Sequence, residues 1–262
     1  MPAKTKEQFV HSVFESIASQ YDFMNDVLSF RRHKAWRKET MKRMNMREGQ
    51  TAIDVCCGTC DWAISMAKAS RYGKIVGLDF SRNMLEVGQA KINKAGLGGQ
   101  IELIHGNAMN LPFEDHRFDY ATIGFALRNV PDIRQVLREM RRVVKPGGMV
   151  VSLELSKPAW QPFKSVYYFY FEKILPRLGK LIAKKYEQYK WLPESLVSFP
   201  DYRELARIFE ETGLEQVQVH PFFGGIAALH IGIKGKDGER HEIRKQKQGD
   251  YGLIKHLHKV NE

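Results

Sequence analysis

The stretch over residues 51–79 constrains the fold of this chain more than any other. An apolar run at 51–55 leads into a loop of small side chains at 56–60, and a second apolar run ends on Asp79. The segment between them, 61–69, has an apolar helical face. Short apolar runs bounded by loops are typical of buried parallel strands. The order strand, tight loop, helix, strand therefore predicts a βαβ unit and an α/β fold.

This unit has the features of a site for a ribose-containing ligand. A loop of small residues lets the ligand approach the backbone, and an acid at the end of the second strand, here Asp79, accepts hydrogen bonds from ribose hydroxyls. The loop has one glycine, Gly58, where a dinucleotide fingerprint needs three. Asp54, at the end of the first strand, could face the cationic end of S-adenosylmethionine, which has no phosphate. The stretch favours S-adenosylmethionine over NAD, and an ordinary βαβ crossover without a ligand is the alternative.

All three cysteines, Cys56, Cys57 and Cys60, lie in this loop. A C-x-x-C spacing could be a thioredoxin-like redox pair or half of a metal site. Zinc would need further ligands, and the sequence has no second cysteine pair. We favour structural cysteines that fill a crowded loop, and we expect no metal.

Composition and charge limit the partners and the location. With 262 residues, 43% of them hydrophobic, the chain can build one large α/β domain, which we expect over 1–234. A net charge of +11 suits an anionic partner, either nucleic acid or a membrane surface, although a solvated surface explains it equally. No apolar run approaches the ~18 residues of a membrane span, and the N-terminus lacks the apolar core of a signal peptide. We expect a cytoplasmic protein. The sequence leaves two further possibilities open, namely peripheral contact with the inner face of the cell membrane and formation of a homodimer.

The N-terminal residues 7–45 are expected to form a helical lid. Apolar side chains recur at helical spacing over 7–21, and a segment dense in polar and aromatic residues follows before the first core strand. A simple surface cap would have the same composition.

Downstream of Asp79 the chain continues as alternating helices and strands. Predicted strands cover 100–105, 118–124 and 149–154, and 215–220 pairs with 226–233. Helices are expected between them, capped by Ser81 and Asp201, started by Pro131, and stopped by Gly96 and by Pro146-Gly147-Gly148. Because parallel strands deliver their carboxyl ends to one crevice, the residues that follow the third and fourth strands belong to the same site. These are Asn107, Ala108, Arg128 and Asn129.

Two further segments differ from this pattern. Residues 157–198 carry many aromatic residues and a basic helical face, which would suit a membrane interface or the wall of a tunnel for an apolar ligand; core packing is the alternative. Residues 235–262 are polar and basic, and we expect a loosely ordered tail.

Several motifs resemble those of the ubiquinone/menaquinone biosynthesis C-methyltransferases, most closely the bacterial menaquinone branch. They are Tyr21-Asp22-x-Met24-Asn25-Asp26-x-Leu28-Ser29-x-x-x-His33-x-x-Trp36, Asp54-Val55-Cys56-Cys57-Gly58-Thr59, Gly124-Phe125-Ala126-Leu127-Arg128-Asn129-Val130, and Arg142-Val143-Val144-Lys145-Pro146-Gly147-Gly148 with Glu154-Leu155-Ser156. The match spans about residues 7 to 234. It implies the class I methyltransferase fold: a Rossmann-like, seven-stranded, mostly parallel sheet with an N-terminal helical lid and an aromatic insertion after the fifth strand.

The resemblance implies that Thr59, Asp79, Asn107 and Ala108 contact S-adenosylmethionine. Some members have a serine at the position of Gly124 that also touches the cofactor. The implied reaction is C-methylation of 2-demethylmenaquinol, a prenylated naphthoquinol, to menaquinol.

We expect catalysis to depend on positioning and on stabilisation of a phenolate. Arg128 is the candidate to stabilise the developing anion, and Asn129 to orient the ring oxygen. A bound water, Tyr21 or His33 could relay the proton. Alternatives are a ubiquinone precursor or another small phenol as acceptor, an RNA methyltransferase, which aromatic helices in place of a basic groove disfavour, and a non-catalytic prenyl-lipid-binding protein.

Overall fold

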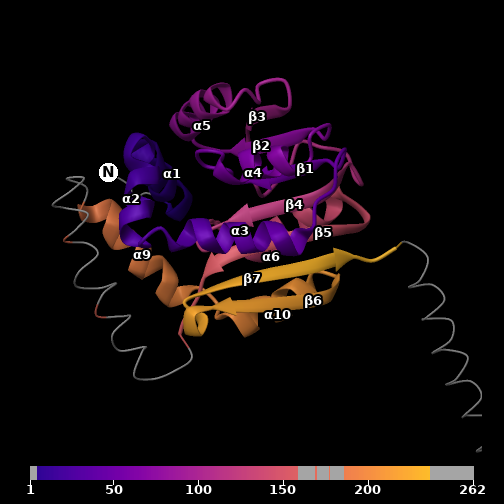
Figure 1. Cartoon of the computed structure of the whole chain (residues 1–262). Helices are drawn as coiled ribbons and strands as arrows, with labels where there is room; N and C mark the ends of the chain where they lie inside the picture. The colour runs from indigo at the N-terminus through magenta and orange to yellow at the C-terminus, as the bar shows by residue number, and fades with distance from the viewer. Residues whose placement is uncertain (1–4, 159–168, 170–176, 178–185, 237–262) are drawn as a thin grey trace, which may run out of the picture.

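A computed structural model describes residues 5–158, 169, 177 and 186–236 (Figure 1). Its centre is one seven-stranded sheet in the order β3-β2-β1-β4-β5-β7-β6. The first five strands are parallel, whereas β7 runs antiparallel to both β5 and β6. The strands are β1 (Ala52–Val55), β2 (Ile75–Asp79), β3 (Ile101–His105), β4 (Phe118–Gly124), β5 (Val144–Leu155), β6 (Leu214–Phe222) and β7 (Ala227–Lys234). Every residue of β1 and β2 is buried, as expected for central parallel strands.

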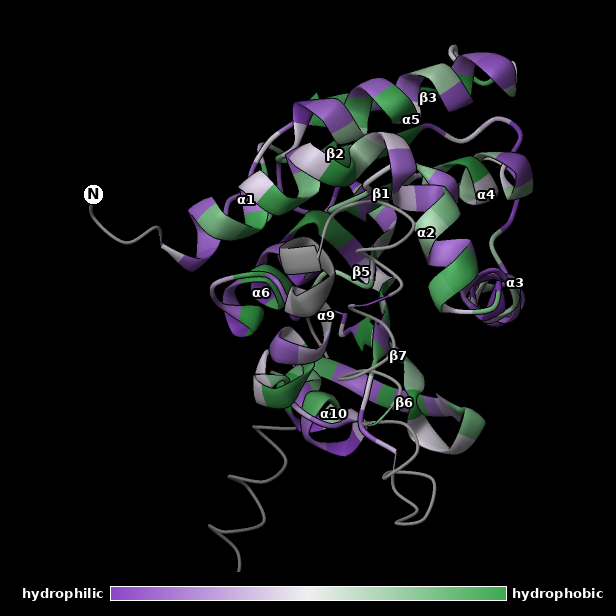
Figure 2. Cartoon of the chain, turned by 90° about the vertical axis from the view of Figure 1, so that its left-hand side faces the viewer, coloured by the Kyte–Doolittle hydropathy of each residue, from purple (hydrophilic) through white to green (hydrophobic). Residues whose placement is uncertain are grey.

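Helices cover both faces of the sheet. Helices α3 (Arg32–Met44), α4 (Asp61–Ala69) and α5 (Arg82–Lys94) pack on one face, and α6 (Ile133–Val143) and α10 (Tyr202–Glu211) on the other. Trp36, Trp62 and Met66 fill the first interface, and Leu137 and Phe209 the second. Figure 2 shows green and purple alternating around α5 and α6, as amphipathic helices on a sheet require.

The N-terminal segment, expected as a helical lid over 7–45, folds as four short elements. They are α1 (Lys6–Ile17), the 3₁₀ turn η1 (Ala18–Gln20), α2 (Tyr21–Leu28) and α3. Thr5 caps α1 in a capping box with Gln8, which fixes where the helix begins. Val13 and Ile17 pack against Met84 of α5, so the segment lies on the domain.

Most sequence-predicted element ends agree with the structure. Ser81 and Asp201 accept hydrogen bonds from the first backbone N–H groups of α5 and α10, as predicted. Two boundaries were wrong. The N-cap of α6 is Asp132, whose carboxylate accepts from Gln135 N, and Pro131 stands before it. The motif Pro146-Gly147-Gly148 lies inside β5, because that strand begins at Val144 and has an irregular register opposite Phe118 and Tyr120.

Among the described residues, the other elements are α9 (Tyr186–Ser198), which contains Pro193, and η3 (Phe223–Gly225). Most of the predicted aromatic insertion at 157–198, and the predicted tail beyond 236, lie outside the described residues. Within the described part of the chain, no helix is both long and apolar enough to cross a membrane.

Candidate active site

Two adjoining cavities open at the carboxyl ends of β1, β2 and β4. The first holds about 700 Å³ of empty space and the second about 540 Å³, and both volumes include solvent-open space at the mouths. The residues that line both are Tyr21, Cys56, Gly58, Gly124 and Phe125. A crevice at the end of parallel strands is where α/β sheets bind ligands. The shared wall means that one extended ligand can occupy both cavities.

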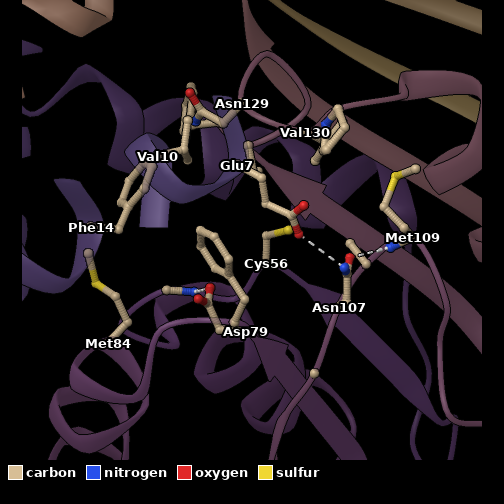
Figure 3. Close-up of a pocket in the computed structure, with 18 of the residues that line it drawn as sticks. Glu7, Val10, Phe14, Cys56, Asp79, Met84, Asn107, Met109, Asn129 and Val130 are labelled. Carbon is tan, nitrogen blue, oxygen red and sulfur yellow. Dashed lines mark hydrogen bonds between the residues drawn. The ribbon is translucent and has the colours of Figure 1, made fainter. Parts of the chain in front are cut away.

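Asp79, the acid that ends β2, lies in the first cavity (Figure 3). Its Oδ2 accepts from the backbone N–H of Gly58 at 2.8 Å, and its Oδ1 accepts from Ser81 N at 2.9 Å. Burial raises the pKa of Asp79, while these backbone donors oppose the shift. A carboxylate can accept about four hydrogen bonds, so beside its backbone donors Ser81, Gly58 and Phe80 the group can still accept one from a ligand hydroxyl.

The loop after β3 supplies the next wall of this cavity. Asn107 Oδ1 accepts from Met109 N at 2.9 Å, and its Nδ2 donates to Glu7 of α1 at 3.2 Å (Figure 3). Lys6 of the same helix donates to the carbonyl of Val130 at 3.0 Å. Helix α1 therefore spans the cavity mouth between two loops. The other walls are mostly apolar; they include Val10, Phe14, Phe80, Met84, Ala108 and Ala126.

The second cavity is polar, and Asp54 lies at its base with 2% of its surface exposed. Thr122 Oγ1 donates to Asp54 Oδ1 at 2.8 Å. Burial raises the pKa of Asp54 to about 7, since no cation forms a salt bridge with it among the described residues. Such a carboxyl group gains most from a ligand that brings a positive charge.

Four charged side chains and Thr59 form a network beside Asp54. Lys91 Nζ lies 2.5 Å from both Asp22 and Asp61, and Arg37 Nη2 lies 2.8 Å from Asp61. Thr59 Oγ1 donates to Asp22 at 2.5 Å and accepts from Lys91 at 3.1 Å. The network joins α2, α3, α4 and α5 around the loop that follows β1. Thr59, expected at the cofactor, lines the second cavity and not the first.

His33 of α3 lines the second cavity, and its hydrogen bonds define its tautomer. Ser29 Oγ donates to the carbonyl of Asn25 at 2.6 Å and lies 2.6 Å from His33 Nδ1. Because a hydroxyl has one proton, Nδ1 must donate to Ser29, which leaves a lone pair on Nε2. Nε2 is 3.5 Å from Asp26 Oδ1. Burial, then the charge of Arg37, lowers the pKa of His33, so the ring is a neutral base at pH 7.

Tyr21, at the start of α2, lines both cavities. Burial raises the pKa of its hydroxyl above the ordinary value of 10.0. The hydroxyl therefore keeps its proton near neutral pH. Tyr21 can pass a proton along a chain, accepting one while donating its own, but it is a poor final acceptor.

Asn129, in the loop after β4, lines the first cavity and is 7% exposed. Its Oδ1 accepts from the indole Nε1–H of Trp191 on α9 at 2.9 Å. Its Nδ2 is buried and has no hydrogen-bond partner among the described residues. A buried donor without a partner costs about 1–3 kcal/mol, so this amide group is prepared for an acceptor atom from a ligand.

The side chain of Arg128 does not point where the sequence predicted, toward an acceptor ring in the crevice. Its Nη1 is 3.0 Å from Oε1 of Glu154 on β5 and also donates to the carbonyl of Phe125. The two charged side chains are 8% and 1% exposed, and Arg128 lines neither cavity. Its carboxylate partner, buried in the next strand, attracts the guanidinium away from the crevice. The pair instead fixes the loop that carries Asn129.

Gly124 and the cysteines complete the shared wall. A Cβ at Gly124 would lie 2.9 Å from the ring of Trp62, so this indole fills the space that a side chain would need. The cysteines are free thiols, and Cys57 Sγ lies 3.8 Å from Cys60 Sγ. Burial raises the pKa of Cys56, which argues against a reactive thiolate. The described residues contain no group of three or more histidine, cysteine or acidic side chains placed to hold a metal ion.

Sequence reasoning missed Glu7, Arg37, Glu154 and Trp191 as parts of this site. Arg37 directly follows the first motif and Glu154 stands within the last, so both had a local signal. Trp191 had none, since its contact with Asn129 depends on how α9 packs.

The sequence matches the model of the ubiE/COQ5 methyltransferase family over residues 2–234. This chain belongs to that family. The matched region ends where β7 ends, so the whole sheet and both cavities lie inside it. Membership fits a crevice that combines an acid at the end of β2 with a loop of small residues after β1.

The names of similar sequences agree with this family. A demethylmenaquinone methyltransferase of Bacillus cytotoxicus is 57% identical over 232 residues, which is 88% of this chain and 98% of the relative. One of Bacillus pumilus is 59% identical over 232 residues, 88% of this chain and 99% of the relative.

Solved structures share the fold. A SAM-dependent methyltransferase from Aquifex aeolicus superposes with a TM-score of 0.57 at 20% identity, covering 75% of this chain and 88% of its own. One from Thermotoga maritima gives a TM-score of 0.61 at 19% identity, covering 86% and 99%. The architecture is the class I fold of S-adenosylmethionine-dependent methyltransferases, as predicted.

Proposed function

We propose that this enzyme transfers the methyl group of S-adenosylmethionine to a ring carbon of 2-demethylmenaquinol, giving menaquinol and S-adenosylhomocysteine. The names of relatives at 57% and 59% identity support this acceptor. The observation that carries the proposal in this chain is the unpartnered amide donor of Asn129, buried in a largely apolar cavity that also contains Asp79.

The residues of the two cavities fit S-adenosylmethionine. Asp79 would take the ribose hydroxyls, with Asn107 and Ala108 beside the adenine. Asp54, a buried carboxyl group without a paired cation, would take the ammonium of the methionine end. Gly58 has a left-handed backbone (φ +52°), and a Cβ there would point toward Tyr21, into the wall shared by the cavities. Its lack of a side chain leaves this passage open, with Thr59 next to it.

Bound S-adenosylmethionine supplies an electrophilic methyl group on a sulfonium. The chain must hold the acceptor carbon in line with that methyl group and exclude water. Such positioning can supply about 7–11 kcal/mol. Helix α1 is bonded through Lys6 and Glu7 to the two loops on either side of the first cavity, and it is the element that closes this cavity above the reactants.

Asn129 would stabilise the acceptor as it ionises. Loss of a phenolic proton raises the electron density at the adjacent ring carbon, which makes that carbon a nucleophile. As this carbon bonds to the methyl group, the methyl–sulfur bond breaks and S-adenosylhomocysteine is released. The hydrogen on the same carbon is then lost as a proton while the phenolic oxygen regains one, which restores the aromatic quinol. The Nδ2 group of Asn129 would donate to the phenolate oxygen in a site with little water, where such a donor is strongest. Trp191 holds Oδ1, so the amide cannot turn its oxygen toward the anion. Trp191 is thus a positioning residue.

Tyr21 and His33 would carry the phenolic proton away. Tyr21 reaches both cavities, and the Nε2 lone pair of His33 is the neutral base of the second. The imidazolium that forms would face Asp26 Oδ1 at 3.5 Å, an oxygen with no hydrogen bond among the described residues. Arg128, through its salt bridge with Glu154, would hold the loop that carries Asn129 in place.

A prenylated quinol resides in a bilayer. We therefore place the enzyme in the cytoplasm with peripheral contact at the membrane surface, which the net charge of +11 favours.

The test is turnover with a short-chain demethylmenaquinone in its reduced and oxidised forms. Release of S-adenosylhomocysteine should require the reduced quinol, because the oxidised quinone has no phenolic proton to lose. Asn129→Ala should lower kcat roughly 10²- to 10³-fold with S-adenosylhomocysteine affinity within about threefold. Asn110→Ala, at an exposed asparagine of another loop, is the matched control and should be neutral. Equal turnover of quinone and quinol would contradict the proposal.

A further inference from the structure

We propose that Arg37 binds the carboxylate of the methionine end of S-adenosylmethionine. This inference rests on the proposed function only in taking S-adenosylmethionine as the ligand. It concerns the second cavity, whose residues have to recognise an amino-acid zwitterion, one positive and one negative group close together.

The position of Asp79 sets the direction in which the ligand extends. Asp79, which would take the ribose, lies in the first cavity and not in the second. Gly58 and Cys56 separate the two cavities and line both. A ligand anchored at Asp79 must therefore extend its amino-acid end past Gly58 into the second cavity.

The charged side chains of the second cavity leave one carboxyl group without a paired cation. The second cavity is lined by three carboxyl groups, those of Asp22, Asp54 and Asp61, and by two basic side chains, Arg37 and His33. Lys91 forms salt bridges with both Asp22 and Asp61 at 2.5 Å, and Arg37 forms a second one with Asp61 at 2.8 Å, so these two carboxylates share two positive charges. Asp54 is left for the ammonium.

Of the two basic side chains, Arg37 is the one suited to a carboxylate. His33 is neutral at pH 7, because burial and Arg37 lower its pKa. Arg37 stays charged and uses Nη2 for Asp61, the one hydrogen bond that its guanidinium makes among the described residues. Asp61 already has Lys91 as a partner, and together Arg37 and Lys91 hold its pKa low even though burial opposes this. The guanidinium therefore retains donors for a second carboxylate, which it can bind with a planar fork.

This contact would also connect separate elements of the fold around the site. Arg37 is on α3, two turns before the end of that helix, and its side chain is 16% exposed. A ligand carboxylate bound there would tie the N-terminal helices to the loop after β1 through the ligand itself. Arg37 is thus a binding residue that the motifs do not include, since the first motif ends at Trp36.

The test is a ligand cycle by calorimetry. The two ligands are S-adenosylhomocysteine and its decarboxylated analogue, the aminopropyl thioether, which keeps the ammonium. In the unmodified enzyme, loss of the carboxylate should weaken binding roughly 10- to 100-fold, the range of a hydrogen bond between charged groups. In Arg37→Gln the two ligands should bind within about threefold of each other. Lys38→Gln makes the same change of charge at the next, exposed position of α3 and should keep the full ratio.

Each other outcome is decisive. If Arg37→Gln weakens both ligands equally, Arg37 acts only through Asp61, and the inference is wrong. If this variant does not fold, Arg37→Lys, which can keep the Asp61 pair, should give an intermediate ratio; an unchanged ratio contradicts the inference. Failure of the unmodified enzyme to bind S-adenosylhomocysteine at all would instead refute the proposed function.

Discussion

The buried pair of Arg128 and Glu154 allows the sharpest prediction about stability. Removing one partner, as in Arg128→Met, leaves an unpaired carboxylate whose side chain is 1% exposed. Breaking a buried pair in this way costs about 3–5 kcal/mol. At roughly 2–4 °C per kcal/mol for a chain of this size, Tm should fall by about 6–20 °C.

Replacing both partners tests the reasoning within the same experiment. Burial raises the pKa of Glu154 even beside Arg128, so desolvation already opposes its charge. The double variant Arg128→Met/Glu154→Leu should therefore recover most of the loss, since apolar replacements of a buried pair are often neutral or stabilising. Urea and thermal unfolding of the three proteins measure this. A single variant within about 1 kcal/mol of the original, or a double variant no better than the single, would refute it.

The same double variant separates two roles of Arg128 in catalysis. If Arg128 only holds the loop that carries Asn129, kcat of the double variant should lie within about tenfold of that of the unmodified enzyme. If the guanidinium itself stabilised the phenolate, kcat would stay roughly 10²- to 10³-fold low in a stable protein, as for loss of an oxyanion donor. The placement of Arg128 against Glu154 predicts the first result.

Three further predictions follow from the cavities. Asp79→Ala should weaken S-adenosylhomocysteine binding roughly 10- to 100-fold by calorimetry with circular dichroism unchanged; unchanged affinity would remove the acid from the ribose site. The pKa of Asp54 is about 7, and the ammonium of the ligand pairs with its ionised form. The affinity for S-adenosylhomocysteine should therefore fall about tenfold per pH unit below 7, and Asp54→Asn should abolish this pH dependence. A flat profile in the unmodified enzyme would contradict that assignment. Trp191→Phe keeps the edge contact with Phe9 but loses the indole N–H, so kcat should fall roughly 3- to 10-fold without a change in S-adenosylhomocysteine affinity, and a normal kcat would show that the indole does not position the amide.

The sequence predicted the fold because local signals and global packing agree. The βαβ unit at 51–79, the caps Ser81 and Asp201, and the apolar strands all specify the elements that the structure contains. The error at Pro146-Gly147-Gly148 has a physical cause. Pro146-Gly147-Gly148 looks like a helix stop, but pairing of β5 with β4 extends the strand through it, and pairing is not visible in a local window.

The candidate site was predictable only in part. Position along the chain placed Asp54, Asp79, Asn107 and Asn129 at one edge of the sheet, since strand ends converge there. It could not show which way a side chain turns. Arg128 leaves the same strand end as Asn129 yet points to Glu154, because a buried carboxylate in the neighbouring strand outweighs an open crevice.

The position of the transferred methyl group tests the central claim most directly. The enzyme would be incubated with reduced demethylmenaquinone and S-adenosylmethionine labelled with ¹³C on the methyl group, and the product analysed by NMR and mass spectrometry. We predict one label per quinol, bonded to a ring carbon, with one S-adenosylhomocysteine released for each. A label on a phenolic oxygen, or S-adenosylhomocysteine formed without labelled quinol, would contradict the account.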